Sequence, residues 1–155
     1  MKPQSILFVC LGNICRSPLA QGIFRHLAID AGIEKHLTIE SAGLGSWHVG
    51  DPPDPRGIRI AAESGFDISR QRARQVAAGD FHRFDLILGM DRSNVRALGD
   101  LCPPESSADV ALYLDRAHGR IADVPDPYYG GDADFHQAIA LIEKASAALI
   151  EKITR

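Results

Sequence analysis

Long apolar runs are missing from this 155-residue sequence. The first residues, MKPQSILFVCLGN, contain one short apolar stretch that Asn13 and Arg16 soon follow, so they fit neither a secretory signal nor a membrane span. Cysteine is scarce as well: an odd number, three, in a chain without an export signal argues against a disulfide framework. We therefore expect a cytoplasmic protein with reduced thiols.

A large excess of charge of one sign is also missing. The formal net charge is −3, which gives no general attraction to nucleic acid or to anionic membranes, so we expect neither as a partner. Any anion that binds must therefore be held by a local arrangement of residues. The length, with 45% hydrophobic and 24% charged residues, is typical of one globular domain over residues 1–155. No apolar stripe is left over, which favours a monomer.

Two familiar phosphate-binding motifs are absent too. A GxxxxGK[ST] loop needs a Gly-Lys pair that this sequence lacks, and GLGSWH has His48 where GxGxxG needs its third glycine. His48 has no second ligand at metal spacing, so we interpret it as a loop residue that lines the entrance of a cleft at most. The sequence thus gives little support to a nucleotide-binding or metal-binding function.

Four short stretches have the pattern of β-strands. Continuous apolar runs at 5–9 (SILFV), 84–88 (FDLIL) and 109–114 (DVALYL) are typical of strands that are covered on both faces. The stretch 37–41 (LTIES) alternates more between apolar and polar residues. We expect it at an edge of the sheet.

Helical patterns separate these strands. The first helix is expected to begin with Pro18, after Ser17 as its N-cap, and to end before Gly32. Further helical patterns cover 55–64, 92–98 and 135–153, with Asp132 as the expected cap of the last helix. Strands that alternate with helices predict a parallel sheet with helices on both faces, and hence a single three-layer α/β domain.

The stretch CLGNICRS, from Cys10 to Ser17, combines a strand end, a glycine turn and a helix start. This placement gathers backbone N–H groups and the positive end of the helix dipole around one point, which attracts an anion such as phosphate. Arg16 adds a planar fork that can hold two phosphate oxygens, while Gly12 and Asn13 tolerate the bend of the backbone. The sequence therefore predicts a phosphate-binding loop directly after the first strand, beyond its carboxyl end.

The same loop can carry a nucleophile. A field that binds a dianion also stabilises the thiolate of Cys10, and a hydrogen bond from Ser17 makes that sulfur a better leaving group. For Cys10 alone a buried strand end is the simpler interpretation, because free cysteines are often buried. The presence of Arg16, Ser17 and the strand-to-helix placement together favours catalysis.

Expulsion of an alcohol or a phenol from a phosphate ester needs a proton that the thiolate cannot supply, so a carboxylic acid must be present. Asp126 in DPYYGG is the candidate. Pro127 favours an extended conformation at Asp126, and Gly130-Gly131 leaves the segment room to move over the phosphate loop. Taken alone, DPYYGG is equally well an acidic turn with two half-exposed tyrosines.

VCLGNICRSPLA and DPYYG together resemble the low-molecular-weight protein tyrosine phosphatases, and the likeness extends to SAG near residue 42, GDPPD, ARQV, FDLILGMD and the last helix. This resemblance implies a single α/β domain with a four-stranded parallel sheet, no metal or cofactor, and hydrolysis of phosphotyrosine in proteins through a cysteinyl-phosphate intermediate. It also implies that Cys10 is the nucleophile, Arg16 the phosphate clamp, Ser17 the aid to thiolate departure, and Asp126 the acid and base.

The resemblance extends to residues around these four. By it, the positions that wall the substrate cleft are Leu11, Ile14, Trp47, Tyr128 and Tyr129, and the phosphate loop is completed by Gly12, Asn13 and Cys15. Cys15 matches a cysteine that can form a disulfide with the nucleophile, although a small packed residue is an equal alternative.

Further positions match residues that support the loop. Asn13 and Ser41 match a hydrogen-bond network that braces it, and Asp91 matches an acid beside the arginine, although helix capping explains Asp91 equally well. Gln71 departs from the family, in which many members have histidine, so the brace must be made differently or by an amide. For Arg70, Arg72 and Arg74 we favour a solvated face over recognition of acidic residues near a phosphotyrosine.

Two other functions stay open at this point. A thiol-dependent arsenate reductase has a related fold and the same Cys-x5-Arg loop, but it needs a relay of two further cysteines, and only Cys102 lies downstream. A phosphate-binding module without turnover would need Arg16 and the loop, but it has no use for Cys10, Ser17 and Asp126 together.

Overall fold

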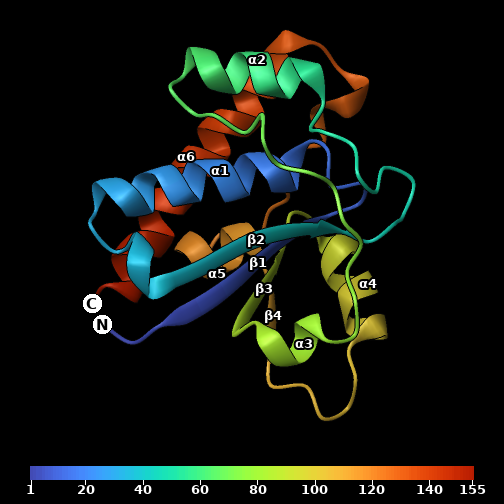
Figure 1. Ribbon diagram of the computed structural model, residues 1–155, viewed down its shortest axis with the longest axis vertical. Coiled ribbons are helices and arrows are strands. Elements are labelled where there is room, and N and C mark those ends of the chain that lie inside the picture. Colours follow the sequence, from blue (N-terminus) through green and yellow to red (C-terminus); the bar gives the residue numbers. More distant parts are fainter.

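The computed structural model describes residues 1–155, and at its centre lies a sheet of four parallel strands in the order β2-β1-β3-β4 (Figure 1). The strands are β1 (Gln4–Cys10), β2 (Leu37–Gly43), β3 (Leu86–Gly89) and β4 (Asp109–Leu112). In the register, Phe8 of β1 lies opposite Ser41 on one side and Leu88 on the other. The predicted parallel sheet is confirmed, and so is the edge position of the strand that begins at Leu37.

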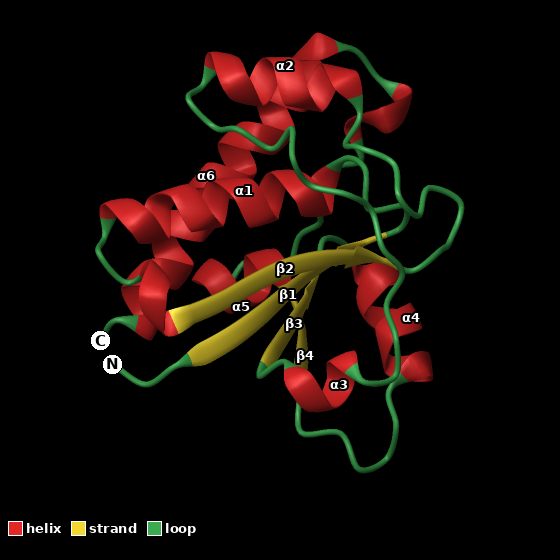
Figure 2. Cartoon of the chain, viewed as in Figure 1, coloured by secondary structure: helices red, strands yellow, loops and turns green.

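Helices cover both faces of the sheet (Figure 2). They are α1 (Arg16–Asp30), α2 (Pro55–Glu63), α3 (Asp80–Arg83), α4 (Arg92–Leu101), α5 (Tyr113–His118) and α6 (Asp132–Ile153), with short 3-10 turns at Glu34–His36 and Pro127–Tyr129. Successive side chains of a strand point to opposite faces, so β1 contributes to two hydrophobic cores. Ile6 and Phe8 join the core with α1, α5 and α6, whereas Leu7 and Val9 join the core with α3 and α4.

The prediction of a strand over 109–114 is wrong at its end, because β4 stops at Leu112 and Tyr113 begins α5. Tyr113 is fully buried, its ring meets Phe8 edge-on at 5.3 Å between centroids, and its hydroxyl lies 2.6 Å from Ser146 Oγ of α6. A buried tyrosine needs a partner for its hydroxyl, and that partner lies on another helix. This tertiary contact explains why the apolar run does not continue as a strand.

The predicted helix caps are also corrected. Helix α1 begins at Arg16 with Cys15 at the cap position, so Ser17 lies inside the first turn and its side chain is free for other contacts. Helix α6 begins at Asp132 itself, after Gly131 as its N-cap, and Asp134 Oδ2 accepts the hydrogen bond from the Gly131 N–H at 2.8 Å.

Other boundaries move by a few residues. The strand expected at 84–88 is β3, Leu86–Gly89, because Phe84 ends the short α3 turn and packs into the core below the sheet. Helix α4 begins at Arg92 as predicted, after the capping box of Asp91 and Asn94, but it continues past the buried Leu98 to Leu101.

The carboxyl ends of the parallel strands meet at one edge of the sheet, and the segments that follow β1 and β2 lie there together. Figure 1 shows α2 on the outer side of the molecule, away from the sheet, next to the orange segment that precedes α6. None of the helices combines the length and the apolar character that crossing a bilayer requires.

Candidate active site

The loop between β1 and α1 folds around backbone groups that face inward. Asn13 has a left-handed backbone, with φ of 59°, a conformation that asparagine tolerates better than most residues. A Cβ added to Gly43 on the neighbouring strand would come within 3.0 Å of the Gly12 carbonyl carbon, so only glycine lets the two backbones approach this closely. The loop is therefore pressed against the end of β2.

The Cys10 thiol lies at the end of β1, directly below the first turn of α1. Its Sγ is 2.9 Å from the Ser17 Oγ, and both residues are buried. Because α1 begins at Arg16, the unpaired N–H groups of its first turn surround this position. This environment favours negative charge, whether on a bound phosphate or on the Cys10 sulfur.

A hydrogen-bond network holds the loop in this shape. The Asn13 amide donates to Ser17 Oγ at 2.8 Å and to Ser41 Oγ at 3.0 Å. Ser41 in turn donates to Gln21 Oε1 at 2.6 Å, and the Arg74 N–H donates to Asn13 Oδ1 at 3.0 Å. Loop, sheet edge and α1 are thereby joined through buried polar groups, which makes the loop rigid.

Arg16 is almost fully buried, with 3% of its surface exposed. Its Nη1 donates to Asp91 Oδ2 at 2.7 Å and to the Val124 carbonyl at 2.9 Å. Asp91 uses its other oxygen to accept from the Asn94 N–H at 2.7 Å, so the predicted pairing with arginine and the alternative of helix capping occur together. These bonds fix the plane of the guanidinium.

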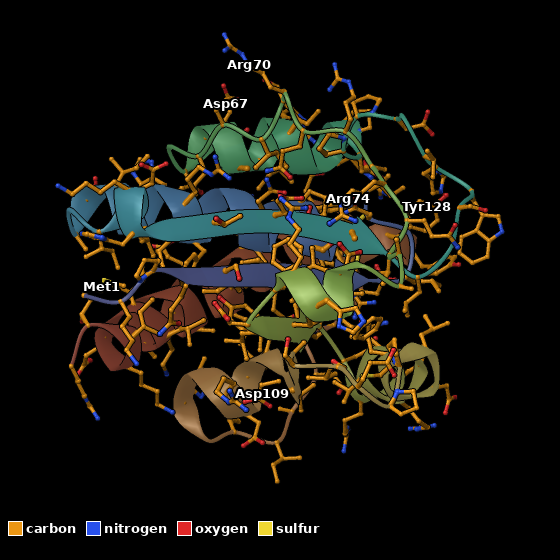
Figure 3. All side chains as sticks on the ribbon, turned by 60° about the horizontal axis from the view of Figure 1, so that its bottom comes forward. Met1, Asp67, Arg70, Arg74, Asp109 and Tyr128 are labelled. Atoms are coloured by element: carbon orange, nitrogen blue, oxygen red, sulfur yellow. The ribbon has the colours of Figure 1, made fainter.

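Asp126 stands across the cleft from the loop. Its Oδ2 is 3.7 Å from Arg16 Nη2, and its Oδ1 accepts from the Tyr128 N–H at 3.1 Å. The short 3-10 turn Pro127–Tyr129 follows, and Tyr128 and Tyr129 are exposed. Figure 3 shows Tyr128 at the end of the molecule opposite to Met1, which is the end where the strands finish.

One cleft of about 280 Å³ brings these groups together. It is lined by Cys10, Leu11, Gly12, Ile14, Cys15, Arg16, Trp47, His48, Asp126, Tyr128 and Tyr129. Cys10, Cys15 and Arg16 are its buried groups, whereas Trp47 is 70% and Tyr129 88% exposed. The cleft thus combines an ionic interior with an aromatic rim, which suits an aryl group that carries an anion.

Comparison with known proteins agrees with this geometry. A family profile described as low molecular weight phosphotyrosine protein phosphatase matches residues 5–155. This chain belongs to that family.

Relatives in the phosphatase family are found in distant organisms. The chain is 40% identical over 152 residues to the low molecular weight protein-tyrosine-phosphatase YfkJ of Bacillus subtilis, covering 97% of this chain and 96% of the relative. It is 44% identical over 136 residues to the low molecular weight phosphotyrosine protein phosphatase of Schizosaccharomyces pombe, 86% of either chain. A crystal structure of a protein tyrosine phosphatase from Entamoeba histolytica superimposes with a TM-score of 0.92 at 35% identity, covering 97% of both chains.

In this member of the phosphatase family, the hydrogen-bond network that holds the phosphate loop does not include residue 71. Gln71 Nε2 donates to the Pro18 carbonyl at 3.0 Å, and its Oε1 is buried with no hydrogen-bond partner. The amide therefore does not reach Asn13 or Ser41. Gln21 and the Arg74 backbone complete the network instead.

Other predicted residues take places away from the cleft. Arg74 is not part of a solvated face, because it pairs with Asp80 at 3.0 Å and with Glu40 at 3.3 Å beside β2 (Figure 3). Arg70 and Arg72 are exposed, as predicted for a solvated face. Cys102 follows α4 and its thiol lies 3.6 Å from the Pro103 carbonyl, outside the cleft.

Cys15 shares the cleft with Cys10 but in a different electrostatic setting. Burial raises the pKa of the Cys15 thiol above its ordinary value, and the negative charges of Asp54 and Cys10 raise it further. Cys15 therefore stays protonated at neutral pH. Of the two thiols in the cleft, only Cys10 has the Ser17 hydroxyl within hydrogen-bond distance.

Sequence reasoning missed Asp54 and Arg56. Asp54 belongs to the GDPPD motif, but its role depends on contacts that the sequence does not show. Its carboxylate bonds to Arg56, and its N–H donates to the Ile14 carbonyl at 2.8 Å. The capping pattern Asp-Pro before a helix was the one available signal, since Asp54 is the N-cap of α2.

Proposed function

We propose that this chain hydrolyses phosphotyrosine in proteins and that residues 1–155 form one phosphatase domain. The observation that carries the proposal is the single cleft that holds the Cys10 sulfur, the Arg16 guanidinium and the Asp126 carboxyl group. A nucleophile, a phosphate clamp and a proton donor on opposite sides of one point are what a phosphate monoester requires.

In the first step the phosphate lies against the loop, held by its backbone N–H groups and by Arg16. The Cys10 thiolate attacks phosphorus, the bond from phosphorus to the phenolic oxygen breaks, and Asp126 gives its proton to that oxygen. Arg16 suits this task because Asp91 and the Val124 carbonyl already hold its Nη1, leaving the rest of the planar group toward the cleft.

In the second step water attacks the cysteinyl phosphate. Asp126, now a carboxylate, takes a proton from that water, and the sulfur leaves as a thiolate. The Ser17 hydroxyl, 2.9 Å from the Cys10 Sγ, donates a hydrogen bond to the departing thiolate. Inorganic phosphate then leaves the loop, and the enzyme returns to its first state.

The rim of the cleft favours an aromatic ester. Leu11, Ile14, Trp47 and Tyr128 present apolar surfaces between which the ring of a phosphotyrosine fits. A phosphoprotein carries such a ring on an exposed segment, and the open rim leaves space for the residues beside it.

The alternative of arsenate reduction receives no support from the position of Cys102. A disulfide relay needs thiols that approach one another, yet Cys102 lies outside the cleft that contains Cys10 and Cys15. The phosphate-binding module without turnover is tested by the assay below.

We also propose that the enzyme works as a cytoplasmic monomer that uses no metal. All three cysteines are free thiols, as suits a reducing compartment. The chemistry needs no metal because Arg16 and the loop stabilise the phosphate charge and Asp126 handles the proton. Sedimentation of the purified chain tests the oligomeric state.

The first experiment is hydrolysis of p-nitrophenyl phosphate in the presence of a metal chelator, followed before the steady state. We expect turnover with an initial burst of p-nitrophenol of about one equivalent per enzyme, because formation of the cysteinyl phosphate releases the phenol before water attacks. Loss of activity in the chelator contradicts the metal-free mechanism. Phosphate binding without any turnover identifies a binding module.

Mild oxidation tests the role of Cys15. Peroxide converts the Cys10 thiolate to a sulfenic acid, and the Cys15 thiolate can then attack that sulfur and expel hydroxide, which forms a Cys10–Cys15 disulfide. Since the pKa of Cys15 is raised, its thiolate fraction grows throughout the range from neutral to alkaline pH. We expect peptide mapping after peroxide treatment to show more disulfide and less sulfinic Cys10 as the pH rises.

In the Cys15→Ser variant, peroxide should inactivate the enzyme and added thiol should not restore it. If wild type yields only sulfinic Cys10 at every pH, Cys15 has no protective role.

A further inference from the structure

We propose that Arg56 is a positioning residue for the general acid: it ties residues 126–131, here called the acid segment, to the phosphate loop. This inference rests on the proposed function. Arg56 lies in the first turn of α2, outside the cleft, and Figure 1 shows that turn beside the segment before α6.

The guanidinium of Arg56 binds two carbonyl groups of the acid segment. Its Nη2 donates to the Tyr128 oxygen and its Nη1 to the Gly130 oxygen, at 2.9 Å each. The same group lies over the ring of Phe135 in α6, with 4.8 Å between the guanidinium carbon and the ring centroid. Arg56 thus contacts the backbone two and four residues after Asp126.

Asp54 anchors Arg56 on the other side. Its carboxylate accepts from Arg56 Nε at 3.1 Å and from Nη2 at 2.9 Å. Burial acts to raise the pKa of Asp54, but the hydrogen bonds from Arg56 outweigh burial and the pKa lies below its ordinary value, so the pair is ionised at neutral pH. A charged, two-bond contact of this kind fixes the direction of the guanidinium.

Asp54 also reaches the phosphate loop. Its backbone N–H donates to the Ile14 carbonyl at 2.8 Å, and Ile14 lines the cleft two residues before Arg16. A continuous connection therefore runs from Ile14 through Asp54 and Arg56 to the carbonyl of Tyr128. It sets the distance between the side of the cleft that holds phosphate and the side that supplies the proton.

Apart from Arg56, the one side chain from outside residues 126–131 that bonds to residues 127–131 is Asp134 of α6, which accepts from the Gly131 N–H at the far end of the segment. Asp126 itself has one long contact from outside, 3.7 Å to Arg16, and its other bond is local, to the Tyr128 N–H. The position of the acid therefore depends on how Arg56 holds the turn that follows it. A displacement of about 1 Å at a catalytic group can lower a rate about 100-fold.

Lysine cannot replace arginine in this role. The planar fork of Arg56 bonds to Asp54, Tyr128 and Gly130 in three directions, whereas the single ammonium group of lysine keeps the charge but cannot span these acceptors. The Arg56→Lys variant therefore separates geometry from charge. Arg59→Lys is the matched control, because Arg59 lies one helical turn after Arg56 in α2 and pairs with Asp132 at the surface.

The test is kcat/KM for aryl phosphates whose leaving groups range from 2,4-dinitrophenol to phenol, because kcat/KM reports cleavage of the bond to the phenolic oxygen and not the hydrolysis of the cysteinyl phosphate, which all substrates share. For Arg56→Lys we expect kcat/KM with phenyl phosphate to fall about 10- to 100-fold, and kcat/KM with 2,4-dinitrophenyl phosphate to fall by a factor of about 3 or less, since a good leaving group needs no proton. Arg59→Lys should match wild type with every substrate. Asp54→Asn should give the pattern of Arg56→Lys.

A double variant identifies the path of the effect. If Arg56 acts through Asp126, then Asp126→Asn with Arg56→Lys should be about as slow as Asp126→Asn alone, because the same contribution is lost only once. Multiplied losses overturn the inference, and so does an equal loss of kcat/KM across leaving groups in a variant whose melting temperature shows that it is folded. If the loss depends on the leaving group in Asp126→Asn but not in Arg56→Lys, the inference about Arg56 is wrong while Asp126 stays the proposed acid. If the loss in Asp126→Asn does not depend on the leaving group, Asp126 is not the acid.

Discussion

Replacement of Cys10 with serine is expected to lower turnover of p-nitrophenyl phosphate by about 10⁴-fold or more, since loss of a nucleophile removes the covalent route. A serine hydroxyl is a far weaker acid than a thiol, so the field of the loop and the α1 N-terminus does not ionise it at neutral pH. The same groups still bind phosphate, because Arg16 and the loop N–H groups are unchanged. Steady-state rates and titration calorimetry with inorganic phosphate measure the two effects separately.

The matched control is Cys102→Ser, which changes the same atom at a position outside the cleft. It should leave both turnover and phosphate binding as in wild type. Appreciable turnover by pure Cys10→Ser protein, with the same dependence on substrate concentration as wild type, would refute the nucleophile assignment. Loss of phosphate binding together with turnover would instead mean that the variant disturbs the loop.

The second large effect is expected for Asp126→Asn, which keeps the size of the side chain but removes its proton. With phenyl phosphate or a phosphotyrosine peptide, kcat/KM should fall about 10²- to 10⁴-fold, the range for loss of a general acid. With 2,4-dinitrophenyl phosphate the loss of kcat/KM should be small, because that phenolate leaves without a proton. A plot of log kcat/KM against the pKa of the leaving phenol measures the difference as a slope, and it is free of the hydrolysis step that all substrates share.

Asp123→Asn provides the control for this slope. Asp123 lies three residues before Asp126, and its carboxylate pairs with Arg92 at 3.1 Å on the surface. Its amide variant removes one negative charge from the same segment, so it should reproduce any general electrostatic effect while leaving the slope as in wild type. Equal losses for all leaving groups in Asp126→Asn would exclude Asp126 from the acid role.

Much of this site could be predicted because its parts are contiguous in sequence. Cys10, Arg16 and Ser17 belong to one strand-loop-helix unit, and the placement of such a unit at the carboxyl end of a parallel strand follows from the pattern of strands and helices. Asp126 is distant in sequence but lies in a stretch with a distinctive composition. The structure puts both stretches at one cleft.

The contacts that hold these groups in place could not be predicted in the same way. Gln21 was an ordinary polar residue on a helix until the fold placed it 2.6 Å from Ser41. Arg56 is one of many arginines, and the two carbonyl groups that it binds, those of Tyr128 and Gly130, lie more than 70 residues away. Long-range pairs of this kind depend on how helices and strands pack, so they cannot be predicted from the periodicity of a short stretch of sequence.

The boundaries of helices and strands also depend partly on contacts that are distant in sequence. The run DVALYL is apolar throughout, so its pattern alone could not decide where the strand ends. The end is set by Tyr113, which turns away from the sheet to meet Ser146 on α6. Likewise, α1 begins at Arg16 and not at the predicted Pro18. The Ser17 hydroxyl contacts Cys10 and Asn13 instead of capping the helix.

The central position of β1 in the sheet makes this strand more resistant to local unfolding than the segment that carries Asp126. Because β1 pairs with β2 along one edge and with β3 along the other, and its residues from Ile6 to Cys10 are buried, exchange of its amide hydrogens with solvent requires the sheet itself to come apart. The turn Pro127–Tyr129 is joined to the rest of the molecule by far fewer bonds and can separate while the sheet is intact. We therefore expect fluctuations of the folded protein to displace the turn that follows Asp126 before they disturb Cys10, so that a partly opened molecule keeps its phosphate-binding loop.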